Sequence, residues 1–283
     1  MNSHQGRAAG RRRFVDFAAP RLGSGRTCLH THGTWAPTAA IGRAVATMAR
    51  TDERNPRESA RWVYERRVEH SACRDIPQSL GDLCHPRRLA LVVYDMQVGV
   101  LGQLPDADAI VARVVEVLQA ARAGGYPIFF LRHMFLPNRL KGMFGLRMAM
   151  AWQRVDSPAQ LQEFLLRDSP EFALVPEMRP RADEAILDKT TMSAFEGTPL
   201  APALRDLGMR AFAIVGIALE VGIEPTVRHA SDLGLIPVVV SDACGGRDRS
   251  AMDRALAGFA FEGSSVITAV ATITVLLRGS APG

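Results

Sequence analysis

From Arg88 to the end of the chain, short runs of apolar residues alternate with amphipathic stretches. The apolar runs have the length and composition of strands buried on both faces, and the stretches between them have helical periodicity. This alternation predicts an α/β domain in which helices cover both faces of a parallel sheet. Six strands are expected, at residues 89–95, 127–133, 184–189, 211–217, 236–243 and 265–268.

Two of the connecting stretches carry clear helix signals. Residues 106–125 begin with Asp residues suited to an N-cap and end with a Gly pair, and residues 198–208 begin with Thr followed by Pro. Residues 215–230, "VGIALEVGIEPTVRHA", predict a buried strand that turns directly into a helix. Such a junction lies at the carboxyl edge of the sheet, where doubly wound domains bind their ligands.

The basic character of the chain belongs to its N-terminal part. The formal net charge is +5, but residues 1–88 carry +8 and residues 89–283 carry −3. Residues 1–50 are rich in Arg, Gly, Ala and Thr without a sustained period, so we expect them to be disordered. They also fit an organellar transit peptide, or a spurious extension ahead of a start at Met48.

The remaining sequence divides into two parts. Residues 51–87 are expected to form a short helical segment, with a charged helix over 56–70, and residues 88–283 form the α/β domain. The insertion at 134–183 is apolar enough for a lid over a pocket, a subunit contact or ordinary core packing.

Composition excludes several classes of function. No basic stripe interleaved with aromatic residues runs through the domain, which disfavours nucleic-acid binding. No apolar run reaches the ~18 residues that a membrane span requires. The four cysteines are scattered, which suits a reducing, cytoplasmic location, and adjacent Cys84 and His85 do not fit the usual spacing of zinc ligands. We therefore expect no bound metal or cofactor.

Two candidate catalytic residues follow strands of the predicted sheet. Asp95 closes the first strand and Lys189 the third, and Lys189 is one of only two lysines in a chain that otherwise uses Arg. A Lys kept at a strand end indicates a site that needs a compact ammonium group with an adjustable pKa. The alternatives are a turn residue for Asp95 and an exposed Lys189 that pairs with Asp188.

Three segments together carry a family resemblance. "ALVVYDMQ", "LDKTTMSAFEGTPL" and "VGIALEVGIEPTVRHASDLGLIPVVVSDA" resemble the isochorismatase-like hydrolases, also called cysteine hydrolases, in the order in which that superfamily has them. The resemblance covers about residues 88–278. It implies a Rossmann-like three-layer α/β/α domain with a six-stranded parallel sheet, a homo-oligomer, and a small-molecule substrate. It also implies a non-proline cis peptide near Ile217, Ala218 and Leu219.

The resemblance implies a catalytic Asp, Lys and Cys, of which this chain has two. The Asp and Lys correspond to Asp95 and Lys189, whereas Gly222 stands at the position of the Cys. Without sulfur no acyl-enzyme forms there. Members of the superfamily that hydrolyse isochorismate also lack the Cys and protonate a vinyl ether with the Asp, so the resemblance implies that Asp95 is a general acid that Lys189 orients. The missing side chain is expected to leave room for a larger substrate, including one with a carboxylate, although a Gly at this position also simply permits a tight turn.

The other candidate substrate-binding residues are Glu220, His133 and Phe195. Glu220 is either a second acid or base, or a carboxylate that complements the start of the helix. His133 ends the second strand without the Asp-x-His partner of a metal site. Cys244 is a weaker candidate for a displaced nucleophile, because a buried small residue is the simpler interpretation.

The sequence leaves three functional hypotheses. The first is a hydrolase that works by acid-base chemistry without a thiol. The second is a binding or scaffold protein that kept the fold and lost the activity. The third is an amidohydrolase in which Asp95 activates water. Because Asp95 and Lys189 are both present, the first hypothesis is favoured over the second.

Overall fold

The computed structural model describes residues 68–71, 74–77 and 79–279. The expectations for residues 1–50, including a start at Met48, lie outside this part of the chain, as does most of the helix expected over 56–70.

The described part of residues 51–87 contains an antiparallel strand pair. Strand β1 (Val68–Ser71) pairs with β2 (Arg74–Pro77), and the short helix α3 (Leu80–Leu83) follows. Residues 68–70 are therefore strand where the charge pattern had predicted helix. The reason is backbone pairing with β2, a partner that helical periodicity does not reveal.

The centre of the molecule is a sheet of six parallel strands, as predicted. Its order is β5-β4-β3-β6-β7-β8. The strands are β3 (Leu89–Tyr94), β4 (Ile128–His133), β5 (Ala185–Lys189), β6 (Ala211–Ile217), β7 (Ile236–Gly245) and β8 (Val266–Thr268). The chain builds outward from β3 to β5 and then returns to the other side of β3. The strand order thus reverses between β3 and β6, which is where such sheets place a ligand.

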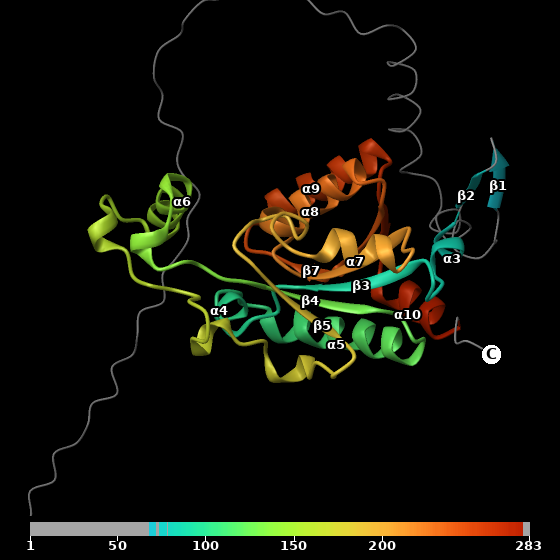
Figure 1. The fold of residues 1–283 in the computed structure, drawn as a ribbon, viewed down its shortest axis with the longest axis horizontal. Coiled ribbons are helices and arrows are strands. Elements are labelled where there is room, and N and C mark those ends of the chain that lie inside the picture. The colour runs from blue at the N-terminus through green and yellow to red at the C-terminus, as the bar shows by residue number, and fades with distance from the viewer. Residues whose placement is uncertain (1–67, 72–73, 78, 280–283) are drawn as a thin grey trace, which may run out of the picture.

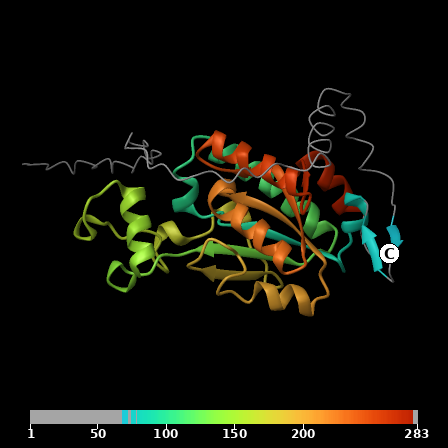
Figure 2. The ribbon, with the colours of Figure 1, turned by 90° about the horizontal axis from the view of Figure 1, so that it is seen from above.

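Helices cover both faces of this sheet (Figures 1 and 2). In Figure 1, α5 (Ala107–Ala123) and α10 (Val270–Gly279) lie below the strands. On the opposite face lie α7 (Leu200–Asp206), α8 (Glu224–Asp232) and α9 (Arg249–Glu262). The three-layer arrangement predicted from the resemblance is therefore present.

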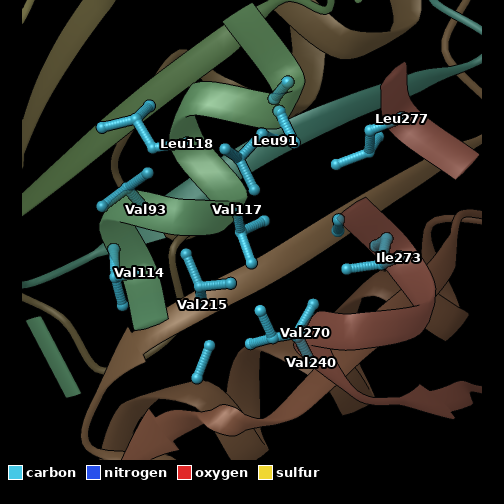
Figure 3. Packing of buried hydrophobic residues seen from close by; sticks show 14 of the residues in the cluster. Leu91, Val93, Val114, Val117, Leu118, Val215, Val240, Val270, Ile273 and Leu277 are labelled. Atoms are coloured by element: carbon cyan, nitrogen blue, oxygen red, sulfur yellow. The ribbon is translucent and has the colours of Figure 1, made fainter. Parts of the chain in front are cut away.

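Successive side chains of β3 point alternately to the two faces of the sheet and contribute to the hydrophobic cluster on each face. Leu91 and Val93 belong to the cluster that packs against α5 and α10, where Figure 3 shows Val117 and Ile273 between the layers. Val92 and Tyr94 belong to the cluster on the opposite face. Because successive strand residues point to opposite faces, Tyr94 lies on the α8 side of the sheet.

The insertion between β4 and β5 extends away from the sheet (Figure 1). It contains α6 (Met143–Gln153) and four 3₁₀ turns, at Asn138–Leu140, Pro158–Gln160, Pro170–Phe172 and Pro176–Met178. It is anchored to the domain where Leu174 bridges to Gln97, just before the short helix α4 (Val98–Leu101).

Candidate active site

Asp95 and Lys189 meet at the carboxyl edge of the sheet. Asp95 follows β3 and Lys189 ends β5, with β4 between the two strands. Lys189 Nζ lies 2.7 Å from Asp95 Oδ2, and their side chains are only 1% and 8% exposed. Asp188 instead pairs with Arg132 at 2.8 Å. The structure thus contradicts the alternative of an exposed lysine paired with its neighbour.

Burial favours the neutral form of both side chains. Desolvation raises the pKa of Asp95, and the charge and hydrogen bond of Lys189 oppose that rise. Desolvation lowers the pKa of Lys189, against the attraction of Asp95. Among the described residues, Asp95 Oδ1 is buried without a hydrogen-bond partner. The pair therefore offers one carboxyl oxygen whose protonation is easier than that of an ordinary aspartate.

The backbone at Asp95 is held in an uncommon conformation. Its φ of 49° lies in the left-handed region, which few non-glycine residues adopt. Gln97, which sequence analysis missed, helps to hold the loop: Nε2 donates to the carbonyls of His133 and Phe172, and Oε1 accepts from the amide of His133. The "DMQ" motif contains this glutamine, but nothing in the sequence shows that it is fully buried.

His133 ends β4 beside the ion pair. It is 6% exposed, and burial is the largest cause that lowers its pKa to about 3. The imidazole is therefore neutral at physiological pH. Within the part of the chain that is described, its Nε2 has no hydrogen-bond partner, while its ring makes an edge contact with Phe135. His133 thus supplies an uncharged polar atom to the site.

Gly222 lies in the π-helical turn Leu219–Ile223 that follows β6. The peptide bond between Ile217 and Ala218 is cis, within the segment that sequence analysis had singled out. A Cβ built on Gly222 would lie 2.6 Å from Cε1 and 2.7 Å from Cζ of Tyr94, and closer still to the phenolic oxygen. The expectation that the missing side chain leaves room for a larger substrate is wrong, because Tyr94 fills that volume.

Glu220 connects this turn to the loop before α9. Its Oε1 accepts from the backbone amides of Arg247 at 2.8 Å and Asp248 at 3.3 Å. Oε2 is buried and has no partner among the described residues. Glu220 thus lies at the site, but the bonds it makes hold a loop in place.

Phe195 does not join the candidate site. Its ring packs edge-on against Phe212 and His229 in the core on the α8 face. The described residues that line the pocket do not include it. The prediction that Phe195 binds substrate fails because the loop after Lys189 turns this side chain inward.

The Asp95–Lys189 pair opens into a cavity of about 530 Å³. Its lining comprises Tyr94, Asp95, Val100, Gln103, Leu104, His133, Phe135, Ala151, Trp152, Phe164, Leu165, Met192, Ile217, Ala218, Glu220, Val221, Gly222, Arg247 and Asp248. Polar groups are concentrated near the strand ends, and the insertion supplies an apolar wall. A second, more open groove of about 900 Å³ runs along α5 and shares no residue with this cavity. The size and mixed character of the first cavity suit a small molecule.

The described cysteines are not reactive groups of this pocket. Cys84 and Cys244 are buried, and burial raises the pKa of both, that of Cys84 to about 12. Among the described residues, no group of three or more His, Cys, Asp or Glu is arranged to hold a metal ion. In the same part of the chain, no helix has the length and apolar character for a bilayer span.

The doubly wound sheet, the buried Asp–Lys pair at its carboxyl edge and the neighbouring strand-to-helix turn form the arrangement that the resemblance to the isochorismatase-like hydrolases implied. Residues 89–271 match the isochorismatase domain family, and the chain belongs to that family.

Several named proteins are similar to this chain. The ureidoacrylate amidohydrolase RutB of Acinetobacter baylyi is 26% identical over 174 residues, which are 56% of this chain and 71% of that protein. RutB of Agrobacterium fabrum is 27% identical over 173 residues, covering 56% of this chain and 76% of that protein.

Solved structures share the fold. A cysteine hydrolase from Pseudomonas syringae pv. phaseolicola superposes with a TM-score of 0.62 at 21% identity, covering 70% of this chain and 96% of that one. An isochorismatase family protein from Burkholderia thailandensis gives a TM-score of 0.55 at 26% identity, covering 68% and 96%.

Proposed function

We propose that this protein is a small-molecule hydrolase in which Asp95 and Lys189 perform acid-base chemistry without a cysteine nucleophile. The observation that carries the proposal is the buried Asp95–Lys189 pair, joined at 2.7 Å, in which Asp95 Oδ1 is left without a partner among the described residues. A carboxyl group whose pKa is raised by burial is suited to donate a proton near neutral pH.

The proposed reaction is the hydrolysis of an enol ether. Protonated Asp95 gives its proton to the terminal carbon of the double bond, and the ether carbon becomes a cation stabilised by its oxygen. Lys189 stabilises the carboxylate that Asp95 becomes. Water adds to the cation and returns a proton to Asp95, and the resulting hemiketal breaks down to a ketone and an alcohol.

The cavity supports a substrate with an unsaturated or apolar body. Phe135, Trp152 and Phe164 form part of the wall that faces the polar end. Arg247 is exposed and also lines the cavity, so it stands at the mouth, where a guanidinium suits a substrate carboxylate. We therefore propose a small, carboxylate-bearing substrate whose reacting bond lies at Asp95.

A second candidate is an amidohydrolase in which ionised Asp95 activates water. Its support is the activity of similar proteins, since RutB, at 26–27% identity, is a ureidoacrylate amidohydrolase. This reaction uses the same residues in the opposite protonation state, so its rate would rise as Asp95 loses its proton. The two candidates also differ in products, because only the amide reaction releases ammonia.

A substrate screen tests the proposal. The full chain is incubated with enol ethers of pyruvate, with amides and with ureido compounds, and the released pyruvate and ammonia are measured by coupled assays. Pyruvate release that survives iodoacetamide treatment is the expected result. Ammonia release alone would select the second candidate. Ligand binding by thermal shift without turnover of any compound would instead favour a catalytically silent protein.

The proposal includes a homo-oligomer in a reducing, cytoplasmic environment. Helix α6 exposes Met143 and Phe144, at 81% and 73%, which is the kind of apolar surface that subunit contacts cover. Cys244 is a free thiol, as a reducing compartment favours. Light scattering on the purified chain measures its mass, and a monomer would contradict this part of the proposal.

A further inference from the structure

Tyr94 and Gly222 occupy adjoining space although they are far apart in the sequence. Tyr94 ends β3 and Gly222 lies in the turn after β6, the neighbouring strand. The phenol packs where a side chain at residue 222 would have to be, with ring carbons 2.6 and 2.7 Å from an ideal Cβ. Real Cβ atoms essentially never come within 3.0 Å of another heavy atom in this way. Any larger residue at 222 therefore requires the ring to move.

The ring has little freedom to move. Tyr94 is 1% exposed, and its hydroxyl donates a hydrogen bond to the carbonyl of Met192. Lys189 Nζ lies 4.2 Å from the ring centre, where the ammonium interacts with the aromatic face. The backbone of Gly222 is not the obstacle, because residue 222 lies in a helical turn and has no positive φ.

We propose that Tyr94 fixes the reaction class of this pocket, because its phenol takes the space that a nucleophilic side chain at residue 222 would need beside Asp95 and Lys189. Burial and the charge of Asp95 raise the pKa of Tyr94, so the phenol stays neutral and is not itself a nucleophile. Residue 222 then cannot carry a nucleophilic thiol, whereas Asp95 and Lys189 can still transfer protons. This inference rests on the proposed function for the reaction class, whereas the competition for space stands on the structure.

A double-mutant cycle tests the competition for space without any substrate. Gly222→Cys is introduced into the full wild-type chain, into Tyr94→Val and into Tyr94→Phe, and the melting temperature is measured for each. In the wild type and in Tyr94→Phe, which keeps the ring, the cysteine is expected to lower the melting temperature by about 5 °C or more, as overpacking does. In Tyr94→Val, where the ring is gone, the same change is expected to shift it by less than about 2 °C.

Two further variants keep the test decisive. Gly222→Ala adds only the Cβ, so it reports the clash even where Gly222→Cys does not fold. Gly145→Ala in α6 is the matched control, since its nearest neighbour beyond the local backbone would be Lys141 Cβ at an ordinary 3.6 Å. An equal loss of stability from Gly222→Cys in all three backgrounds would overturn the proposal.

Thiol labelling tests the chemical half of the proposal. In the Tyr94→Val/Gly222→Cys protein, iodoacetamide at pH 7 is expected to modify the thiol at position 222, because that position lines the cavity. Mass spectrometry locates the label. A protein that folds normally but resists labelling at position 222 would contradict the claim that Tyr94 alone closes the site. A failed substrate screen would leave both results unchanged, so the proposed function and this inference can fail separately.

Discussion

Removal of the ammonium from the buried pair is expected to destabilise the protein in a pH-dependent way. Lys189→Met keeps most of the side-chain length but leaves Asp95, at 8% side-chain exposure, without its partner. Breaking a buried ion pair in this manner costs about 3–5 kcal/mol when the remaining group is charged. We therefore expect the free energy of unfolding at pH 8 to fall by that amount relative to the wild type.

Protonation of Asp95 relieves this loss at lower pH. In the variant the pKa of Asp95 is raised further above its unfolded value, so the folded protein binds the proton more tightly than the unfolded chain does. The contribution of Asp95 to the stability of the variant is therefore fully present at pH values below its pKa in the unfolded chain. It is lost as the pH rises through its pKa in the folded protein. The difference in the free energy of unfolding between the variant and the wild type should shrink by up to about 1.4 kcal/mol for each pH unit below the pKa of Asp95 in the folded variant.

Urea unfolding of the wild type and the variants at pH 5 and pH 8 measures this effect. Lys141→Met is the matched control, since Lys141 is partly exposed and is the other lysine of the chain, and it should change stability by less than about 1 kcal/mol at both pH values. The double variant Asp95→Asn/Lys189→Met should recover most of the loss at pH 8. Equal destabilisation at both pH values, or no recovery in the double variant, would refute the reasoning.

Other parts of the site give further expectations. Gln97→Leu leaves the backbone groups of His133 and the carbonyl of Phe172 without their buried partner, so unfolding experiments should show a loss of about 2–5 kcal/mol; a change below about 1 kcal/mol would contradict the positioning role. Burial lowers the pKa of His133 to about 3, so the folded protein is stabilised by the neutral imidazole at pH values above the pKa of the unfolded chain. This contribution to the free energy of unfolding is lost as the pH falls toward 3. NMR should accordingly show no titration of this imidazole between pH 5 and 8, and a midpoint near 6.5 would disprove its burial. Iodoacetamide at pH 7 should leave Cys84 and Cys244 unmodified in the folded protein, and rapid labelling of either, mapped by mass spectrometry, would contradict their burial.

The sheet could be predicted because its information is local. The strands are short apolar runs bounded by turn residues, and their observed ends lie within two residues of the predicted ones. The convergence of Asp95 and Lys189 follows from the same reasoning, since residues that end parallel strands share one edge of the sheet. The structure brings the two groups together at 2.7 Å.

The features that sequence reasoning missed depend on contacts between distant residues. In the sequence, Tyr94 is indistinguishable from the other apolar residues of its strand. Only the packing of β3 against the turn after β6 shows that its ring fills the space at Gly222. Phe195 was assigned to the pocket by its motif, but the fold of the loop turns it into the core. Local patterns do not encode which way such side chains point.

The helix α6 and the strand pair β1-β2 illustrate a second limit. The insertion that contains α6 carries apolar residues without a clear indication of which face is buried, and the structure both exposes Phe144 and places Trp152 at the cavity. Residues 68–70, which the charge pattern had predicted as helix, form a strand because Val68–Ser71 pairs with Arg74–Pro77. In the strand pair, backbone pairing overrides the local preference for helix, whereas in the insertion contacts between distant residues decide which side chains are buried.

The central claim is that the carboxyl group of Asp95 drives the reaction, and the most direct test is the rate of Asp95→Asn on a substrate from the screen. The amide keeps the size of the side chain and cannot supply the acidic proton. The account predicts that kcat/KM falls by about two to four orders of magnitude while the circular dichroism spectrum of the protein is unchanged. A variant that retains the wild-type rate within a few-fold would contradict the account.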